Sequence, residues 1–136
     1  MSNLNYNPNL ASKMLKTAQE ALKNSYSPYS KIRVGASVLT SKGNMYQGSN
    51  IENSSYGLTL CAERVAIAHA ISIEGSDFSI SAIGIAVSPW MPCPLCGACC
   101  QFISEFGTNI LIISQDLDGN PVQRMLKEYL PYHFSI

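Results

Sequence analysis

Four of the five cysteines in the chain lie in the segment MPCPLCGACC, residues 91–100. If a helix begins at Cys96, Cys99 lies one turn further along the same face, and both sulfurs can reach one metal ion. Cys61 lies at the start of an earlier predicted helix and can supply a third thiolate. Soft ligands of this kind are typical of zinc sites. The pattern therefore predicts a zinc ion bound by Cys61, Cys96 and Cys99.

Two residues next to the first cysteine extend this prediction from metal binding to catalysis. Zinc with three protein ligands keeps a fourth position for water, and Glu63 can hold a carboxylate beside the metal to accept and pass on that water's proton. Three thiolates place much negative charge on the ion, and the guanidinium of Arg64 can offset it by donating hydrogen bonds to the sulfurs. The residues thus indicate a hydrolytic metal centre.

Two other interpretations of the thiols stay open at this point. Because Cys93 lies three residues before Cys96, a closed structural site could use all four sulfurs of Cys61, Cys93, Cys96 and Cys99. A redox C-x-x-C pair is also possible, although it leaves Glu63 without a role. We expect Cys93, between two prolines, to lie in an extended loop as a packed or free thiol, and Cys100 to lie in the core.

The elements that must position these residues alternate between helices and buried strands. Apolar residues at three- and four-residue spacings predict the first helix, and short apolar runs predict the strands. In chain order we expect a helix over 9–25, strands over 32–40 and 44–50, a helix over 61–73, a strand over 81–87, a helix over 96–106, a strand over 109–114 and a helix over 121–130. This order predicts a layered α/β domain with a mixed sheet.

Composition limits the classes of function. The 136 residues are enough for one domain, residues 1–136, and nine basic residues balance nine acidic ones, so a nucleic-acid partner is not expected. Only 13% of the residues are charged while 46% are hydrophobic, which favours surface buried between subunits. No membrane-spanning segment or export signal is apparent, and crowded cysteines suit a reducing compartment, so we expect a cytoplasmic protein without a membrane partner.

The motifs resemble those of the small, homotetrameric, zinc-dependent cytidine deaminases, a group within the cytidine and deoxycytidylate deaminase superfamily. The resemblance depends first on C-A-E-R (61–64) and C-G-A-C (96–99). Further matches follow the family's order along nearly the whole chain: Tyr29-Ser30-Lys31, Val34-Gly35-Ala36, Asn50-Ile51-Glu52-Asn53, Gln101 with Ile103-Ser104-Glu105, and Leu130-Pro131 with Phe134.

This resemblance implies a three-layer α/β/α sandwich and one zinc ion per subunit, bound by Cys61, Cys96 and Cys99 without Cys93 or Cys100. It implies hydrolytic deamination of cytidine and deoxycytidine to uridine and deoxyuridine, with release of ammonia, in pyrimidine salvage. Zinc-bound hydroxide would attack C4 of the base, and Glu63 would shuttle the proton.

The resemblance also implies substrate contacts. Asn50 and Glu52 would hold the ribose, and the pattern supports this because residues two apart on a strand face the same way. Backbone groups around Ala62 would read the base edge. Phe134 would pack against the base in the site of a neighbouring subunit, and Tyr56 would lie between subunits of the homotetramer.

Three positions depart from the family's pattern. Ile32 stands where an aromatic residue is common, so one face of the base would lose ring stacking, while Leu95 and Cys100 replace the usual proline and arginine around the second cysteine pair. Ile32 leaves open a deaminase of the same fold that acts on another aminopyrimidine nucleoside, such as blasticidin S. From a different class, a non-catalytic zinc-stabilised interaction module also stays open.

Overall fold

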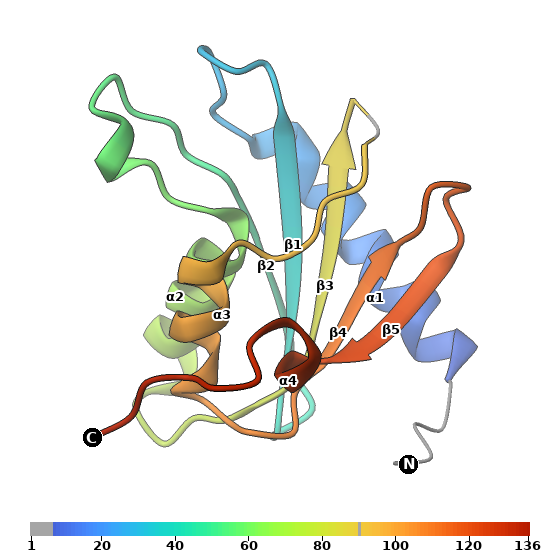
Figure 1. Cartoon of the computed structure of the whole chain (residues 1–136), viewed down its shortest axis with the longest axis vertical. Coiled ribbons are helices and arrows are strands. Elements are labelled where there is room, and N and C mark those ends of the chain that lie inside the picture. Colours follow the sequence, from blue (N-terminus) through green and yellow to red (C-terminus); the bar gives the residue numbers. More distant parts are fainter. Residues whose placement is uncertain (1–6, 90) are drawn as a thin grey trace.

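The computed structural model describes residues 7–89 and 91–136 as one mixed five-stranded sheet with helices on both faces (Figure 1). The strands are β1 (Arg33–Thr40), β2 (Met45–Ser49), β3 (Ile80–Ser88), β4 (Leu111–Gln115) and β5 (Pro121–Met125). The helices are α1 (Pro8–Ala21), α2 (Ala62–Glu74), α3 (Gly97–Ser104) and α4 (Leu126–Tyr129), with short 3-10 helices at Leu22–Asn24 and Tyr56–Leu58. The predicted layered α/β fold is confirmed.

The sheet has the strand order β2-β1-β3-β4-β5. β1 pairs antiparallel with β2 and β3, β4 pairs antiparallel with β5, and only β3 and β4 run parallel. A parallel pair requires a crossover connection, and the described part of that connection contains residues 91–96 and α3. The crossover therefore carries the cysteine-rich segment from the end of β3 across the sheet.

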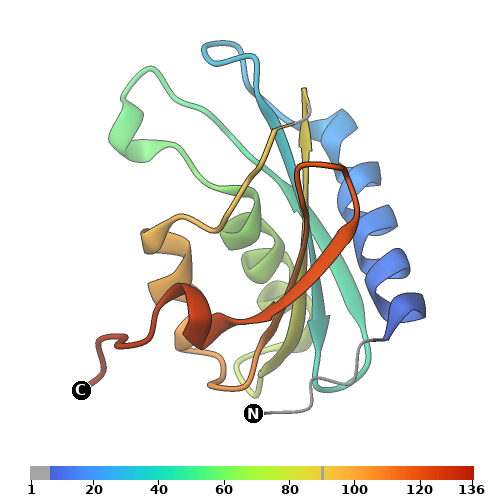
Figure 2. The same cartoon turned by 45° about the vertical axis from the view of Figure 1, so that its right-hand side comes forward.

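Neighbouring residues of each strand divide between the two faces. Ile83 and Ile112 pack in the larger core under α2 and α3, whereas Ala82 and Ile113 pack in the smaller core under α1. Figure 2 shows α1 alone on one side of the sheet and α2 and α3 together on the other. The two helices that carry the predicted ligands thus lie side by side against one rigid surface.

Small residues let α2 approach the sheet closely. A Cβ atom added to Gly48 of β2 would lie 2.3 Å from the backbone nitrogen of Ala66 in α2. Because the clash is with backbone atoms, no change of side-chain rotamer could relieve it. The contact therefore defines how far α2 stands from β2.

The predicted helix over 121–130 is wrong in its first half. Residues 121–125 form β5 at the edge of the sheet, and only Leu126–Tyr129 are helical. The preceding turn explains the difference: Asp116 Oδ1 accepts hydrogen bonds from the backbone N–H groups of Asp118 and Asn120, and Gly119 has φ +84. Such a turn reverses the chain and pairs the next residues with β4. Pro121 is tolerated because it begins an edge strand.

The other predicted elements are present with boundaries shifted by a few residues. Gly75 ends α2 with φ +85, as a helix-terminating glycine is expected to do. Within residues 7–89 and 91–136, no helix combines the length and apolar character needed to cross a membrane.

Candidate functional site

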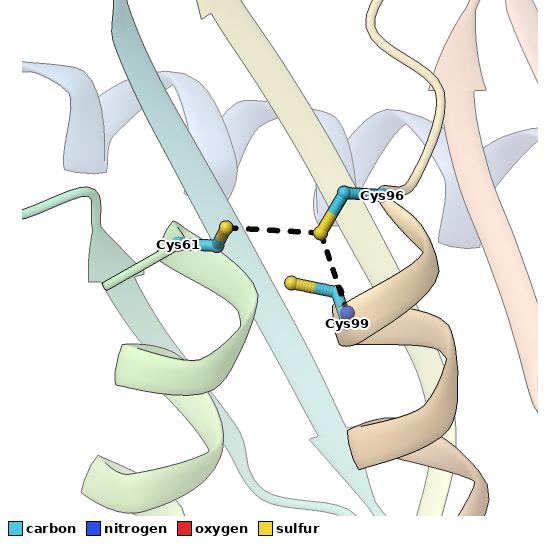
Figure 3. Close-up of side chains that lie close together, drawn as sticks. All are labelled: Cys61, Cys96 and Cys99. Carbon is cyan, nitrogen blue, oxygen red and sulfur yellow. Dashed lines mark hydrogen bonds between the residues drawn. The ribbon is translucent and has the colours of Figure 1, made fainter. Parts of the chain in front are cut away.

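The three predicted metal ligands come together at the adjoining starts of α2 and α3 (Figure 3). Cys61 is the N-cap residue of α2, and Cys96 is the N-cap residue of α3, where its sulfur accepts a hydrogen bond from the backbone N–H of Cys99 at 3.3 Å. The N-terminal ends of helices carry partial positive charge, which favours ionised sulfur. The prediction that Cys96 opens a helix and directs Cys99 to the same site is confirmed.

The sulfur positions fit a tetrahedral zinc ion. Sγ of Cys61 lies 3.8 Å from Sγ of Cys96, and the three sulfurs all lie within 4.8 Å of one another. A tetrahedral ion with Zn–S bonds of ~2.3 Å requires sulfur atoms about 3.8 Å apart. The separation of Cys61 and Cys96 meets this requirement, and the distances from the third sulfur to these two exceed it by at most about 1 Å.

The thiols of Cys61 and Cys99 differ in how readily they ionise. Hydrogen bonds from Cys99, Arg64 and Cys96 lower the pKa of Cys61 to about 5, although partial burial opposes the shift. The pKa of Cys99 is raised because its thiol donates to Cys61 and is buried. Cys61 is therefore the sulfur of this pair that ionises more readily, and metal binding would draw the proton from Cys99.

Arg64 donates a hydrogen bond to a ligand sulfur, as the sequence predicted. Its terminal nitrogen donates to Sγ of Cys61 at 3.5 Å and to the carbonyl oxygen of Thr59 at 3.4 Å. The hydrogen bond to Cys61 is the main reason that the pKa of the guanidinium is raised above its ordinary value. Arg64 thus ties a ligand to the loop before it and places a permanent positive charge beside the sulfurs.

Glu63 lies beside the three sulfurs without belonging to their set. It occupies the first turn of α2, is 5% exposed, and has Oε2 3.8 Å from Sγ of Cys99. Burial, followed by the charge of Cys61, raises the pKa of this carboxyl. A carboxyl group held in a dry position next to a metal can exchange protons with a metal-activated water and a bound substrate.

Ala62 is fully buried at the first position of α2. Backbone N–H groups in the first turn of a helix have no intrahelical partner, and those of α2 lie at the end of the helix that carries Cys61. The role of Ala62 in reading a base edge remains a prediction.

The two residues predicted to hold a sugar differ in their surroundings. Asn50 is 8% exposed and makes three contacts within the chain: Oδ1 accepts from the backbone N–H of Val34 at 2.9 Å and from the hydroxyl of Ser25, and Nδ2 donates to the carbonyl oxygen of Ile32 at 2.9 Å. β2 ends at Ser49, and Ile51 forms only isolated bridges. The regular strand that would turn both side chains toward one ligand has therefore ended before Glu52.

Glu52 lines a cavity of about 410 Å³, a volume suited to a small molecule. The other lining residues are Tyr29, Ser30, Asn53, Tyr56 and Thr59. Thr59 borders the cavity and also receives the hydrogen bond from Arg64, which connects this region to the metal end of the site. The sequence identified Glu52 but assigned no role to Ser30, whose hydroxyl donates to Glu52. Ser30 lies 22 residues before Glu52, so the one available signal was its place in the family match Tyr29-Ser30-Lys31.

The two remaining cysteines lie outside the three-sulfur set, as predicted. Cys93 is half-buried against the core, and burial raises its pKa to about 11. Cys100 is 2% exposed within the larger core. The closed four-sulfur interpretation is therefore not supported, and its loss removes the main reason to consider a purely structural zinc module.

Phe134 and Tyr56 are strongly exposed, at 72% and 77%. The side-chain amide of Gln101 in α3 holds the backbone of Phe134. It donates to the carbonyl oxygen of Phe134 and accepts from its N–H, both at 2.9 Å. The C-terminal segment runs past the end of α3 that is remote from Cys96 (Figures 1 and 2). Within one chain, Phe134 thus points to solvent.

Comparisons with known proteins agree with this geometry. Residues 8–115 match the family described as the cytidine and deoxycytidylate deaminase zinc-binding region. A cytidine deaminase of Halalkalibacterium halodurans is 37% identical over 123 residues, which cover 90% of this chain and 92% of that protein. A probable cytidine deaminase of Dictyostelium discoideum is 42% identical over 123 residues, covering 90% and 82%.

Solved structures show the same likeness. A crystal structure of cytidine deaminase from Burkholderia pseudomallei superposes with a TM-score of 0.81 at 31% identity, covering 90% of this chain and 98% of that one. The corresponding structure from Mycobacterium tuberculosis gives a TM-score of 0.76 at 34% identity, covering 92% and 97%.

Proposed function

The chain belongs to the cytidine and deoxycytidylate deaminase zinc-binding family, and on that basis we propose that it catalyses the hydrolytic deamination of cytidine and deoxycytidine to uridine and deoxyuridine. The observation that carries the proposal is the set of three sulfurs at zinc-binding separations with the buried Glu63 beside it. Cys61, Cys96 and Cys99 hold one zinc ion per subunit.

When bound, zinc supplies a Lewis acid that makes water a nucleophile near neutral pH. Glu63 accepts a proton from the water that attacks C4 of the pyrimidine. It delivers this proton to N3, which leaves a tetrahedral carbon with a hydroxyl and an amino group at C4. Glu63 then takes the proton of that hydroxyl and delivers it to the amino group, so that C4=O forms as the C4–N bond breaks and ammonia departs. Because each delivery restores the carboxylate, one residue serves as both base and acid. Its burial keeps competing solvent away from the transfer.

The remaining residues orient and complete the site. Glu52, at the cavity, accepts a hydrogen bond from the ribose, and Asn50 supports the same end of the substrate. Backbone groups at Ala62 bind the base edge. Ile32 contacts one face of the base without ring stacking, so the base is held mainly by polar contacts and by shape.

We place the active form in a homotetramer whose sites are completed across subunit interfaces. Phe134 is exposed on a segment held by Gln101, and Tyr56 and Leu58 are exposed on the loop beside the cavity. Apolar side chains presented in this way suit burial by a second subunit. Light scattering of the wild-type protein and of Phe134→Ala, together with their KM values, tests this assembly; a fully active monomer would exclude it.

A role in pyrimidine salvage fits this reaction, which converts one pyrimidine nucleoside to another. A cytoplasmic location fits the five unpaired cysteines, because thiols persist in reducing compartments.

Ammonia release and the absorbance change of the base test the activity. The substrate panel is cytidine, deoxycytidine, cytosine, CMP and blasticidin S. We expect turnover of the first two nucleosides. Turnover of blasticidin S alone would instead identify a deaminase of different base specificity, an outcome for which Ile32 would be the first position to examine.

A further inference from the structure

A turn over residues 29–32 surrounds the carboxylate of Glu52. The backbone N–H groups of Tyr29 and Ser30 donate to Oε1 at 2.9 and 3.1 Å, and the hydroxyl of Ser30 donates to Oε2. Both carboxylate oxygens are thus held by one short segment that lies far from Glu52 in sequence. Backbone donors that converge in this way form a concave anion-binding turn.

The hydroxyl of Ser30 also stabilises the turn itself. It accepts a hydrogen bond from the backbone N–H of Ile32 at 3.0 Å. Between these two residues Lys31 has φ +62 and is the one non-glycine residue with positive φ in the described ranges 7–89 and 91–136. A left-handed residue at this position reverses the chain and brings the donors onto one carboxylate. Ser30 therefore connects the turn to Glu52 through a single oxygen atom.

The hydrogen bonds leave Glu52 with limited remaining capacity. An ionised carboxylate has about four acceptor positions, and the turn occupies three of them. Hydrogen bonding by Ser30 is the main cause of a lowered pKa at Glu52, with smaller contributions from the backbone of residues 29 and 30 and from the charge of Lys31. The group is therefore an oriented anion with one acceptor position open at the cavity.

Asn50 differs from Glu52 in its location, because it is only 8% exposed and is not among the residues that line the cavity. Its carbonyl oxygen and its amide nitrogen are engaged with Ser25, Val34 and Ile32. Two further backbone hydrogen bonds, from Tyr26 to Asn50 and from Glu52 to Tyr26, join the same segments. The side chain of Asn50 thus fastens the 25–34 segment, and recognition of a sugar hydroxyl depends chiefly on how Glu52 is held.

We propose that Ser30 is a positioning residue for sugar recognition: its hydroxyl orients Glu52 so that the open acceptor position meets a hydroxyl group of the nucleoside. This inference rests on the proposed deaminase function and adds to it the residue that determines selectivity for a hydroxyl-bearing sugar. Ser30 acts through Glu52 and has no part in the chemistry at the base.

The test compares cytidine with 2′,3′-dideoxycytidine, which lacks both ring hydroxyls. In Ser30→Ala we expect KM for cytidine to rise about ten-fold, the worth of a hydrogen bond to a charged group, with kcat within about two-fold of wild type. KM for the dideoxy substrate should change less than about two-fold. Ser30→Thr keeps the hydroxyl and should restore the cytidine value. Ser41→Ala is the matched control, because Ser41 lies in an exposed turn at the other end of β1 and its hydroxyl makes no hydrogen bond within the described residues.

A double-mutant cycle adds a second readout. If Ser30 acts through Glu52, Ser30→Ala should have little further effect on cytidine KM in a Glu52→Ala background. An equal rise in KM for both substrates, or no rise for either, would overturn the proposal. So would additive rises in KM for cytidine in the double variant.

A third measurement separates this inference from the activity. Titration of the Glu52 carboxyl carbon by NMR should show its pKa rise in Ser30→Ala and stay unchanged in Ser41→Ala. A pKa that does not move in Ser30→Ala contradicts the positioning role. Absence of ammonia release by the wild-type protein would instead reject the deaminase function, while the titration would still report whether Ser30 holds the carboxylate.

Discussion

Replacing Gly48 by alanine tests whether the approach of α2 to the sheet positions the catalytic centre. The added Cβ would lie 2.3 Å from the backbone nitrogen of Ala66 and 2.8 Å from its Cα. Relief to an ordinary van der Waals contact of at least 3.4 Å requires β2 and α2 to separate by about 1 Å, since only backbone atoms are involved. The first turn of α2, which carries Glu63 next to Cys61, would be displaced with the helix.

Two effects of this separation can be estimated. Overpacking of a core costs about 1–3 kcal/mol, and a clash between backbone atoms belongs at the upper end, so we expect a loss of about 3 kcal/mol in the free energy of unfolding. A shift of ~1 Å in a catalytic group can lower the rate by about 100-fold. The variant should therefore lose activity even at temperatures where it is folded.

Urea unfolding, zinc content and kcat/KM for cytidine measure these effects. Gly57→Ala is the control, because a Cβ at that position meets no heavy atom within 4 Å, and its stability should stay within about 0.5 kcal/mol of wild type. Wild-type stability and turnover in Gly48→Ala would refute the idea that this contact defines the position of α2.

Three further predictions concern the centre and its surroundings. Glu63→Gln should retain zinc and nucleoside binding but lower kcat by about 10²–10⁴-fold, the usual contribution of general acid–base catalysis; wild-type turnover would remove Glu63 from the mechanism. Cys99→Ala should lose zinc and become insensitive to chelators, whereas Cys93→Ala should keep both metal and activity, as zinc analysis of the two purified variants can show. Hydrogen bonds from Asn44, Thr40 and Tyr46 outweigh burial and lower the pKa of Glu74, so its contribution to stability is present above the ordinary carboxyl pKa and is lost as the pH falls through the lower folded-state value. Between about pH 5 and 3, the free energy of unfolding of Glu74→Gln should accordingly fall less steeply with decreasing pH than that of wild type. An equal slope in the two proteins would contradict a stabilising role for the Glu74 carboxylate.

The two halves of the metal centre were predictable from local sequence because each lies within about one turn of a helix start. Cys96 and Cys99 are separated by one helical turn, and Glu63 and Arg64 follow Cys61 directly at a helix start. The prolines on both sides of Cys93 favoured an extended loop for it, but the residues alone left a four-sulfur site open, and the family resemblance excluded Cys93. Cys61 lies 35 residues before Cys96, and only the packing of α2 beside α3 brings its sulfur to the other two (Figure 3).

The C-terminal region shows where local pattern was insufficient. Residues 121–130 have a composition compatible with a helix, but the edge of β4 offers hydrogen-bond partners to the first five of them. The turn beginning at Asp116 makes that pairing possible. Residues 121–125 thus form a strand because hydrogen bonding to β4 outweighs their weak helical preference.

The amino-acid sequence by itself determined which groups can bind zinc and move protons, because those abilities depend on residue type and on spacing within one helical turn. Only the tertiary structure decided that Asn50 is engaged within the protein while Glu52 faces a cavity, held by the turn at Ser30. The physical reason is that a side chain's free hydrogen-bonding capacity is what remains after its folded neighbours have bound it. Those neighbours come from segments that only the packed sheet and helices bring together.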